Sequence, residues 1–192
     1  MPNSSEEVVI DKPRRRSRIR EGHENKILSV AEHLFSQNGF NGTALETIAE
    51  KAGMSKQNLI YYFSSKEVLY QQVLKNILDM WVEKMALLGQ HGESPKAMLR
   101  NYIRGKVELS RSHPNASKVF AIEIINGAPF LKAYLQSHLS PALDADVKLV
   151  KQWIADGVMD DVDPYHLFFM IWSSTQTYAD FSSQIGARRA RH

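Results

Sequence analysis

Residues 43–67 (TALETIAEKAGMSKQNLIYYFSSKE) constrain the fold more than any other stretch of the chain. Apolar residues recur there at helical spacing as far as Ala52, and Gly53 stands where a left-handed residue commonly ends a helix. Ser55 is a favourable N-cap for a second short helix over about residues 56–63. Two short helices joined by a tight glycine-containing turn predict a helix-turn-helix, whose second helix enters the major groove of DNA.

Two capping boxes are expected to set the helix starts in this region. Thr43 with Glu46 would begin the first short helix, and Ser64 with Glu67 would begin a long helix to about residue 88. In each box the hydroxyl accepts from a first-turn amide, and the glutamate reaches back to the cap.

The second short helix carries candidate DNA contacts. Its inward residues are expected to be Leu59, Ile60 and Phe63. Five others are expected to face outward: Lys56, Gln57, Asn58, Tyr61 and Tyr62. Gln and Asn can pair bidentately with adenine, and Tyr can donate to a phosphate. The alternative is that the polar residues are only solvated and the tyrosines half-buried.

Positive charge gathers next to this motif. Six of the nine residues from 12 to 20 are basic and none is acidic, whereas residues 71–185 hold 11 bases and 12 acids. The arm includes Arg14, Arg15, Arg16 and Arg18. This distribution favours a polyanionic partner. We expect residues 1–22 to form a mostly disordered arm whose arginines attract phosphates or enter the minor groove; a solvated arm is the alternative.

The rest of the chain is expected to be helical, and the predicted fold class is all-α. The expected helices cover residues 24–38, 94–111, 114–125, 130–155 and 164–181, besides those named above. The apolar positions are expected to be Met98, Leu99, Tyr102, Ile103 and Val107 in the second of these, and Leu143, Val147, Val150 and Ile154 in the fourth. No segment shows the alternation of a strand.

Several classes of protein are excluded by what the sequence lacks. There is no cysteine, so disulfides, thiolate metal sites and thiol catalysis are ruled out. No catalytic or nucleotide-binding motif is visible, and the seven histidines are scattered, so we expect neither an enzyme nor a metal or other cofactor. No apolar run is long enough to span a membrane and no signal peptide is evident, so a cytoplasmic location is expected.

The stretch AGMSKQNLIYYFSSKEVLY resembles the DNA-binding signature of the TetR family of transcriptional regulators. The resemblance implies a homodimer that binds a double-stranded operator with an inverted repeat. It implies a basic arm (1–22), a DNA-binding head (23–66), a helical ligand-binding and dimerisation body (67–185) and a basic tail (186–192). It also suggests that Thr43 and Lys66 touch phosphates.

A small-molecule effector is suggested by residues of the body. Trp81, Trp172, Gln176 and Tyr178 could surround a flat, hydrogen-bonding ring, although ordinary core packing would also explain them. The stretches NILDMW, INGAPFL and IWSSTQTYADF are similar to those of TetR-family repressors of pyrimidine utilisation, which respond to uracil or thymine. That similarity runs from about residue 24 to 183 and makes these four residues pocket candidates.

Two alternatives stay open at this point. The effector could be hydrophobic, in a pocket lined by Met85, Met98 and Phe120. The chain could instead be a helical interaction module without regulated DNA binding. Residues 186–192 are too few and too polar for the packed helix that the family usually places at its dimer interface, which favours a weakened dimer.

Overall fold

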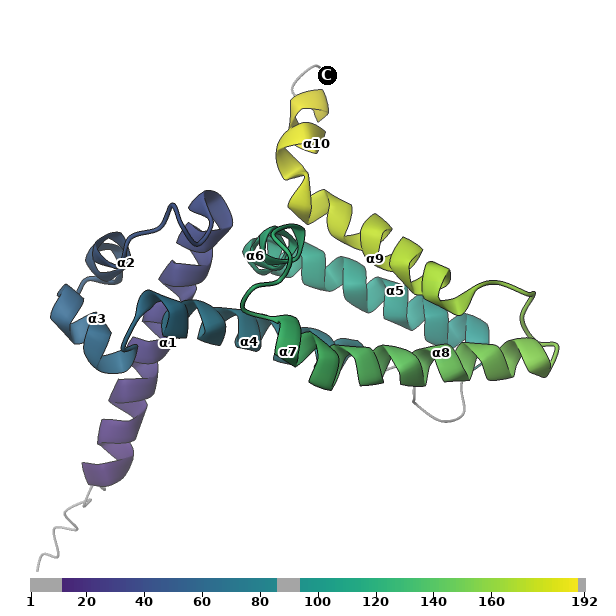
Figure 1. Cartoon of the computed structure of the whole chain (residues 1–192), viewed down its shortest axis with the longest axis horizontal. Helices are drawn as coiled ribbons and strands as arrows, with labels where there is room; N and C mark the ends of the chain where they lie inside the picture. Colours follow the sequence, from purple (N-terminus) through teal and green to yellow (C-terminus); the bar gives the residue numbers. More distant parts are fainter. Residues whose placement is uncertain (1–11, 86–93, 190–192) are drawn as a thin grey trace, which may run out of the picture.

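The computed structural model describes residues 12–85 and 94–189, and every regular element in these ranges is helical (Figure 1). The helices are α1 (Lys12–Asn38), α2 (Leu45–Ala52), α3 (Lys56–Tyr62), α4 (Lys66–Met85), α5 (Pro95–Ser112), α6 (Pro114–Ile125), α7 (Lys132–Tyr134), α8 (Ser140–Ala155), α9 (Pro164–Asp180) and α10 (Ser182–Arg189). A π-helical turn, Leu135–Leu139, joins α7 to α8. The all-α fold predicted from the sequence is confirmed. None of the described helices is long and apolar enough to cross a bilayer.

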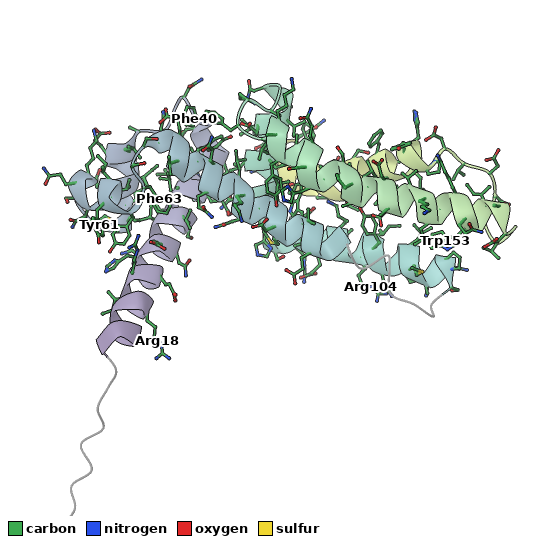
Figure 2. The ribbon with its side chains drawn as sticks, turned by 60° about the horizontal axis from the view of Figure 1, so that its bottom comes forward. Arg18, Phe40, Tyr61, Phe63, Arg104 and Trp153 are labelled. Atoms are coloured by element: carbon green, nitrogen blue, oxygen red, sulfur yellow. The ribbon has the colours of Figure 1, made fainter. Side chains whose placement is uncertain are left out.

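The helices form a small head and a longer body connected by α4. Helices α1, α2 and α3 lie together at one end, and α4 runs from them toward the body of α5, α6, α8 and α9 (Figure 1). One buried apolar core joins the head to α4 and α6, and a second core lies between α5, α8 and α9. Figure 2 shows Tyr61 at the outer edge of the head and Trp153, a member of the second core, toward the opposite end of the molecule.

Helix starts in the body follow the local sequence closely. Ser94 caps α5, with its Oγ accepting from the Ala97 N–H at 3.4 Å, and Asp163 caps α9 by accepting from the His166 N–H at 3.0 Å. Each cap is followed by proline, which suits the first helical position because its missing N–H has no intrahelical partner there. Pro114 likewise begins α6, as the sequence predicted.

Both ends of the described chain are more helical than expected. Helix α1 begins at Lys12, so the second half of the supposed disordered arm is helical, and residues 1–11 lie outside the described residues. Arginine is a good helix former, and the run from 14 to 21 contains neither glycine nor proline. At the other end, residues 182–189 form α10, a short helix that the sequence did not predict. Of its residues 183–187, only Ile185 is partly buried.

Neither predicted capping box forms. The N-cap of α2 is Ala44, which makes no side-chain cap bond, while the Thr43 hydroxyl donates backward to Gly39 O at 2.8 Å. Thr43 therefore ties down the end of α1 instead of starting α2. At α4 the cap is shifted by one residue, since Ser65 and not Ser64 accepts from the Val68 N–H at 3.2 Å.

The expected faces of three helices are also corrected. On α5 the buried positions are Met98, Tyr102, Lys106, Leu109 and Ser110, whereas Ile103 and Val107 are exposed. On α8 they are Asp146, Val147, Val150 and Trp153, with Leu143 and Ile154 only partly buried. On α3, Leu59 and Phe63 are buried as expected, but Ile60 is exposed. The structure thus buries Lys106 and Asp146, two charged residues that the apolar pattern does not predict to be buried.

Candidate functional site

The turn between α2 and α3 has the geometry of a helix-turn-helix. Gly53 adopts φ 72°, ψ 38°, and its N–H together with that of Met54 closes the end of α2 on the carbonyls of Glu50 and Ala49. Ser55 then caps α3, accepting from the Asn58 N–H at 3.2 Å. The buried Leu59 anchors α3 against the core of the head. These contacts hold one face of α3 inward and leave the other for a partner.

The outward face of α3 carries polar and aromatic groups. Lys56, Gln57 and Asn58 are exposed at its first turn, and the Tyr61 side chain is 73% exposed. Tyr62 is half-buried, with its ring 5.8 Å from the ring of His23 on α1. A short helix that presents amides and phenols beside a fixed turn can offer donors and acceptors to base edges and phosphates.

The basic groups around α3 come partly from α1. Arg20 lies with its guanidinium 5.9 Å from the centre of the Tyr61 ring and pairs with Glu24 at 2.8 Å. Arg18 is exposed two residues earlier, where α1 projects past the head (Figure 2). Arg14, Arg15 and Arg16 belong to the first turns of the same helix. The arm therefore extends as a basic helix next to α3.

Two lysines that were predicted to contact DNA have protein partners in this structure. Lys56 forms an exposed ion pair with Glu46 at 2.5 Å. The Lys66 ammonium donates to the backbone carbonyls of Phe40 (2.9 Å) and Thr43 (3.1 Å), and lies 4.4 Å from the centre of the Phe40 ring. Lys66 thereby fixes the start of α4 to the turn between α1 and α2.

In the body, the two predicted tryptophans gather around a lysine that the sequence did not single out. The Lys106 ammonium lies 4.6 Å from the ring centre of Trp81 on α4 and 6.0 Å from that of Trp172 on α9. The Lys106 side chain is 5% exposed, and burial lowers its pKa to about 8, against the opposing effect of the Asp180 carboxylate.

A buried tyrosine and aspartate extend this cluster. The Trp172 Nε1–H donates to the Tyr102 hydroxyl at 2.7 Å, and burial raises the pKa of Tyr102. Asp146 on α8 is buried, and its Oδ2 has no hydrogen-bond partner among the described residues. Burial raises the pKa of Asp146 to about 7. We call Trp81, Tyr102, Lys106, Asp146 and Trp172 the interior polar cluster.

A groove of about 680 Å³ opens beside the interior polar cluster, between the end of α1, α6 and α9. Gln176 and Asp180 lie on its wall, with Phe120, whose ring packs edge-on against Trp81 at 4.5 Å. The Ser117 hydroxyl donates to Asp180 at 2.5 Å. Tyr178 is 70% exposed and lines a different groove with Val107 and Arg111, so it lies apart from the other three predicted pocket residues.

The apolar pattern missed Lys106 and Asp146 because both are charged. Lys106 stands four residues after Tyr102 and three before Leu109, which places it on the same helix face as two buried residues. A charged residue in register with a buried stripe was the signal that could have revealed it. Asp146, one residue before Val147 and four before Val150, carries the same signal.

Two family models match successive parts of the chain. Residues 27–73 match the model for bacterial regulatory proteins of the tetR family, and residues 74–192 match the model for the YcdC-like protein C-terminal region. The HTH-type transcriptional regulator RutR of Escherichia coli K12 is 46% identical over 173 residues, covering 90% of this chain and 81% of RutR. IcaR of Staphylococcus aureus, the negative regulator of the biofilm operon icaADBC, is 27% identical over 177 residues, covering 85% of this chain and 87% of IcaR.

Solved structures of transcriptional regulators share the fold at lower identity. The ketosteroid transcriptional regulator KstR2 of Mycobacterium tuberculosis superposes with a TM-score of 0.71 at 19% identity, covering 88% of this chain and 91% of KstR2. AibR, solved with isovaleryl coenzyme A and operator DNA, gives a TM-score of 0.68 at 21% identity, covering 82% and 85%. At these identities the similarity concerns the fold.

Proposed function

The chain belongs to the TetR family of bacterial regulatory proteins, and from that membership we propose that it binds an inverted-repeat operator as a homodimer and answers to a pyrimidine such as uracil or thymine. It is a DNA-binding transcriptional regulator with repressors among its relatives, and not an enzyme. The operator geometry, the dimer and the effector are our proposals.

The exposed first turn and Tyr61 of α3 carry the DNA-binding proposal. Gln57 and Asn58 stand at the N-terminal end of the helix, where a recognition helix meets base edges. Tyr61 and the basic start of α1 lie alongside, in position for the phosphates that flank those bases. Thr43 is 3% exposed and its hydroxyl donates to Gly39 O, so we propose that any phosphate contact there uses the backbone.

The DNA test separates base reading from phosphate attraction. An operator would first be selected from random duplexes, and its affinity then measured by fluorescence anisotropy for wild type, Gln57→Ala and Arg18→Ala. We expect Gln57→Ala to lose about 1–3 kcal/mol of binding free energy at one operator position and to relax the preference for one base there. Arg18→Ala should weaken binding to all sequences alike. It should also reduce the slope of log affinity against log salt concentration by about 1. If Gln57→Ala weakens binding to every sequence equally, Gln57 does not take part in base recognition.

The exposed side of α9 supports a homodimer. Phe169 and Met170 are adjacent exposed apolar residues of α9, and Met170 is 71% exposed. Large apolar side chains grouped on an exposed helix face are typical of a surface that a partner covers. A twofold dimer through α9 would present the two heads to successive major grooves, about 34 Å apart.

Sedimentation velocity provides the dimer test. We expect the wild type to sediment as a dimer and Met170→Glu to sediment as a monomer, since the substitution buries a charge in the interface. Lys151→Glu, an exposed change on α8, is the matched control and should leave the dimer intact. A dimer that persists in Met170→Glu would place the interface elsewhere.

The effector proposal rests on the two indoles and the polar groups between them. Trp81 and Trp172 can stack on or wall a flat ring, while Lys106, Tyr102 and Gln176 can hydrogen-bond to carbonyls and ring N–H groups. The motifs around Trp81 and Trp172, which resemble those of pyrimidine-responsive repressors, point to the same ligand class.

A thermal-shift series tests the effector. Uracil and thymine should raise the melting temperature by mass action, and cytosine should raise it less because its amino group replaces a carbonyl acceptor. Trp172→Phe keeps an aromatic ring but loses the Nε1 donor, and it should reduce the shift. Absence of a shift with either dione would refute the pyrimidine assignment and leave the DNA-binding regulator unaffected.

The groove itself favours one alternative, an apolar effector. Its wall includes Phe120, Ile124, Ile125 and Phe181, and its volume of about 680 Å³ suits a ligand larger than one ring. Fatty acids in the same thermal-shift series test this directly. A shift with fatty acids that Phe120→Asp abolishes, with none from pyrimidines, would favour the alternative.

A further inference from the structure

Lys106 is a buried cation whose charge no neighbouring carboxylate neutralises directly. Its side chain is 5% exposed, and among the described residues no carboxylate oxygen lies within 4 Å of its ammonium. Asp180 is the one carboxylate that acts on Lys106 electrostatically, and its Oδ1 is engaged by the Ser117 hydroxyl at 2.5 Å. The nearest partners of the ammonium are two indole faces.

Indole faces only partly replace a counter-ion. A cation–π contact stabilises an ammonium less than a carboxylate does, and buried charges in proteins are normally paired. The ammonium nevertheless stays between Trp81 and Trp172, the two residues with which a flat ligand would stack. A ring that enters between the indoles therefore meets an uncompensated positive charge at its edge.

The interior polar cluster lies one side chain away from solvent. Phe120 faces the groove and touches Trp81 edge-on at 4.5 Å, and Asp180 lies on the groove wall while acting on Lys106. The Phe120 ring thus lies between the groove and Trp81, so the route that we infer for a ring from the groove to Lys106 passes Phe120.

We propose that Lys106 is the specificity-determining residue of the effector site and that the site selects planar rings carrying negative charge, either an ionised ring amide or a ring carboxylate. The ligand supplies the counter-ion that the protein lacks, and its charge rests against the ammonium while its faces contact Trp81 and Trp172. The inference rests on the proposed effector function and narrows its ligand class.

Isothermal titration calorimetry on the full chain at pH 7 tests the charge requirement. The probes are uracil, thymine, 5-fluorouracil and 5-nitrouracil, whose ring N–H acidity increases in the order thymine, uracil, 5-fluoro and 5-nitro because the substituents withdraw more electron density. We expect affinity to rise in the same order, with 5-nitrouracil binding at least about tenfold more tightly than uracil. Benzoate serves as the anionic ring that is not a pyrimidine.

Three variants separate the charge of Lys106 from its packing. Lys106→Met keeps an unbranched buried stem and should abolish the dependence of affinity on ring N–H acidity. Lys106→Arg keeps the charge and should retain that dependence. Arg104→Met, a change to an exposed base on the same helix two residues earlier, is the matched control and should behave like wild type. Circular dichroism melting of each variant checks that the fold is intact.

The outcomes distinguish this inference from the effector proposal itself. Pyrimidine binding without an acidity trend, or a trend that survives in Lys106→Met, overturns the role of Lys106 and leaves the pyrimidine effector standing. Lys106-dependent binding of benzoate without pyrimidine binding supports the anionic ring and refutes the pyrimidine. Failure of every anionic ring to bind overturns the inference.

Discussion

Replacing Asp146 by asparagine should remove a pH-dependent loss of stability. Asp146 is buried on α8 with an unpartnered Oδ2, and burial raises its pKa from 3.8 to about 7 in the folded chain. A carboxyl whose folded pKa is raised holds its proton longer when folded than when unfolded. Stability is therefore lost as pH rises through the interval from about 4 to about 7, and is flat above it.

The size of the effect follows from the shift. Each unit of pKa difference corresponds to about 1.4 kcal/mol, so ionisation of Asp146 costs the folded state about 4 kcal/mol in full. The amide of Asp146→Asn does not titrate. Relative to wild type, the variant should therefore gain about 1.3 kcal/mol of unfolding free energy between pH 5 and 6 and about 1 kcal/mol between pH 6 and 7.

Urea unfolding followed by circular dichroism at pH 5, 6, 7 and 8 measures this difference directly. Asp160→Asn, an exposed change in the turn before α9, is the control and should parallel wild type at every pH. The reasoning is refuted if Asp146→Asn and wild type keep a constant difference in unfolding free energy across this range, because Asp146 would then titrate alike in both states.

Three further substitutions have defined outcomes. Gly53→Ala places a Cβ on a residue with φ 72° and should lower unfolding free energy by about 1–2 kcal/mol in a denaturant titration. Tyr70→Phe removes the 3.2 Å bond to the buried Glu123 and should cost about 1–2 kcal/mol in the same assay. Lys66→Met loses two bonds to head carbonyls; it should weaken operator binding in anisotropy assays while calorimetry shows unchanged effector affinity.

Helix positions were largely readable from the sequence because their signals are local. Pro114 begins α6 and Gly53 ends α2, each through backbone preferences that need no tertiary partner. Cap identity was less predictable. The Thr43 hydroxyl can bond either to the first-turn amides of α2 or to the carbonyls at the end of α1. Tertiary packing favours the carbonyls.

The candidate effector site shows where sequence patterns stop being informative. Trp81 and Trp172 were identified by residue type and by resemblance, but the group between them was not. On α5 two apolar stripes overlap, one through Ile103 and Val107 and one through Lys106. The apolar residues alone do not choose between the two stripes, whereas packing against α9 and α8 buries the second. Which face is buried depends on its neighbours, and that information is absent from a single helix.

Helix α4 connects the interior polar cluster to the head, with contacts at both ends. At its start, Lys66 holds the carbonyls of Phe40 and Thr43 in the turn that precedes α2. Fifteen residues later, about 22 Å along the axis, Trp81 lies under the Lys106 ammonium. A ligand that moves Trp81 must therefore bend α4 or move the head with it. Because Tyr70 and Leu74 on α4 are fully packed in the core shared with the head, movement of the head is the less costly response.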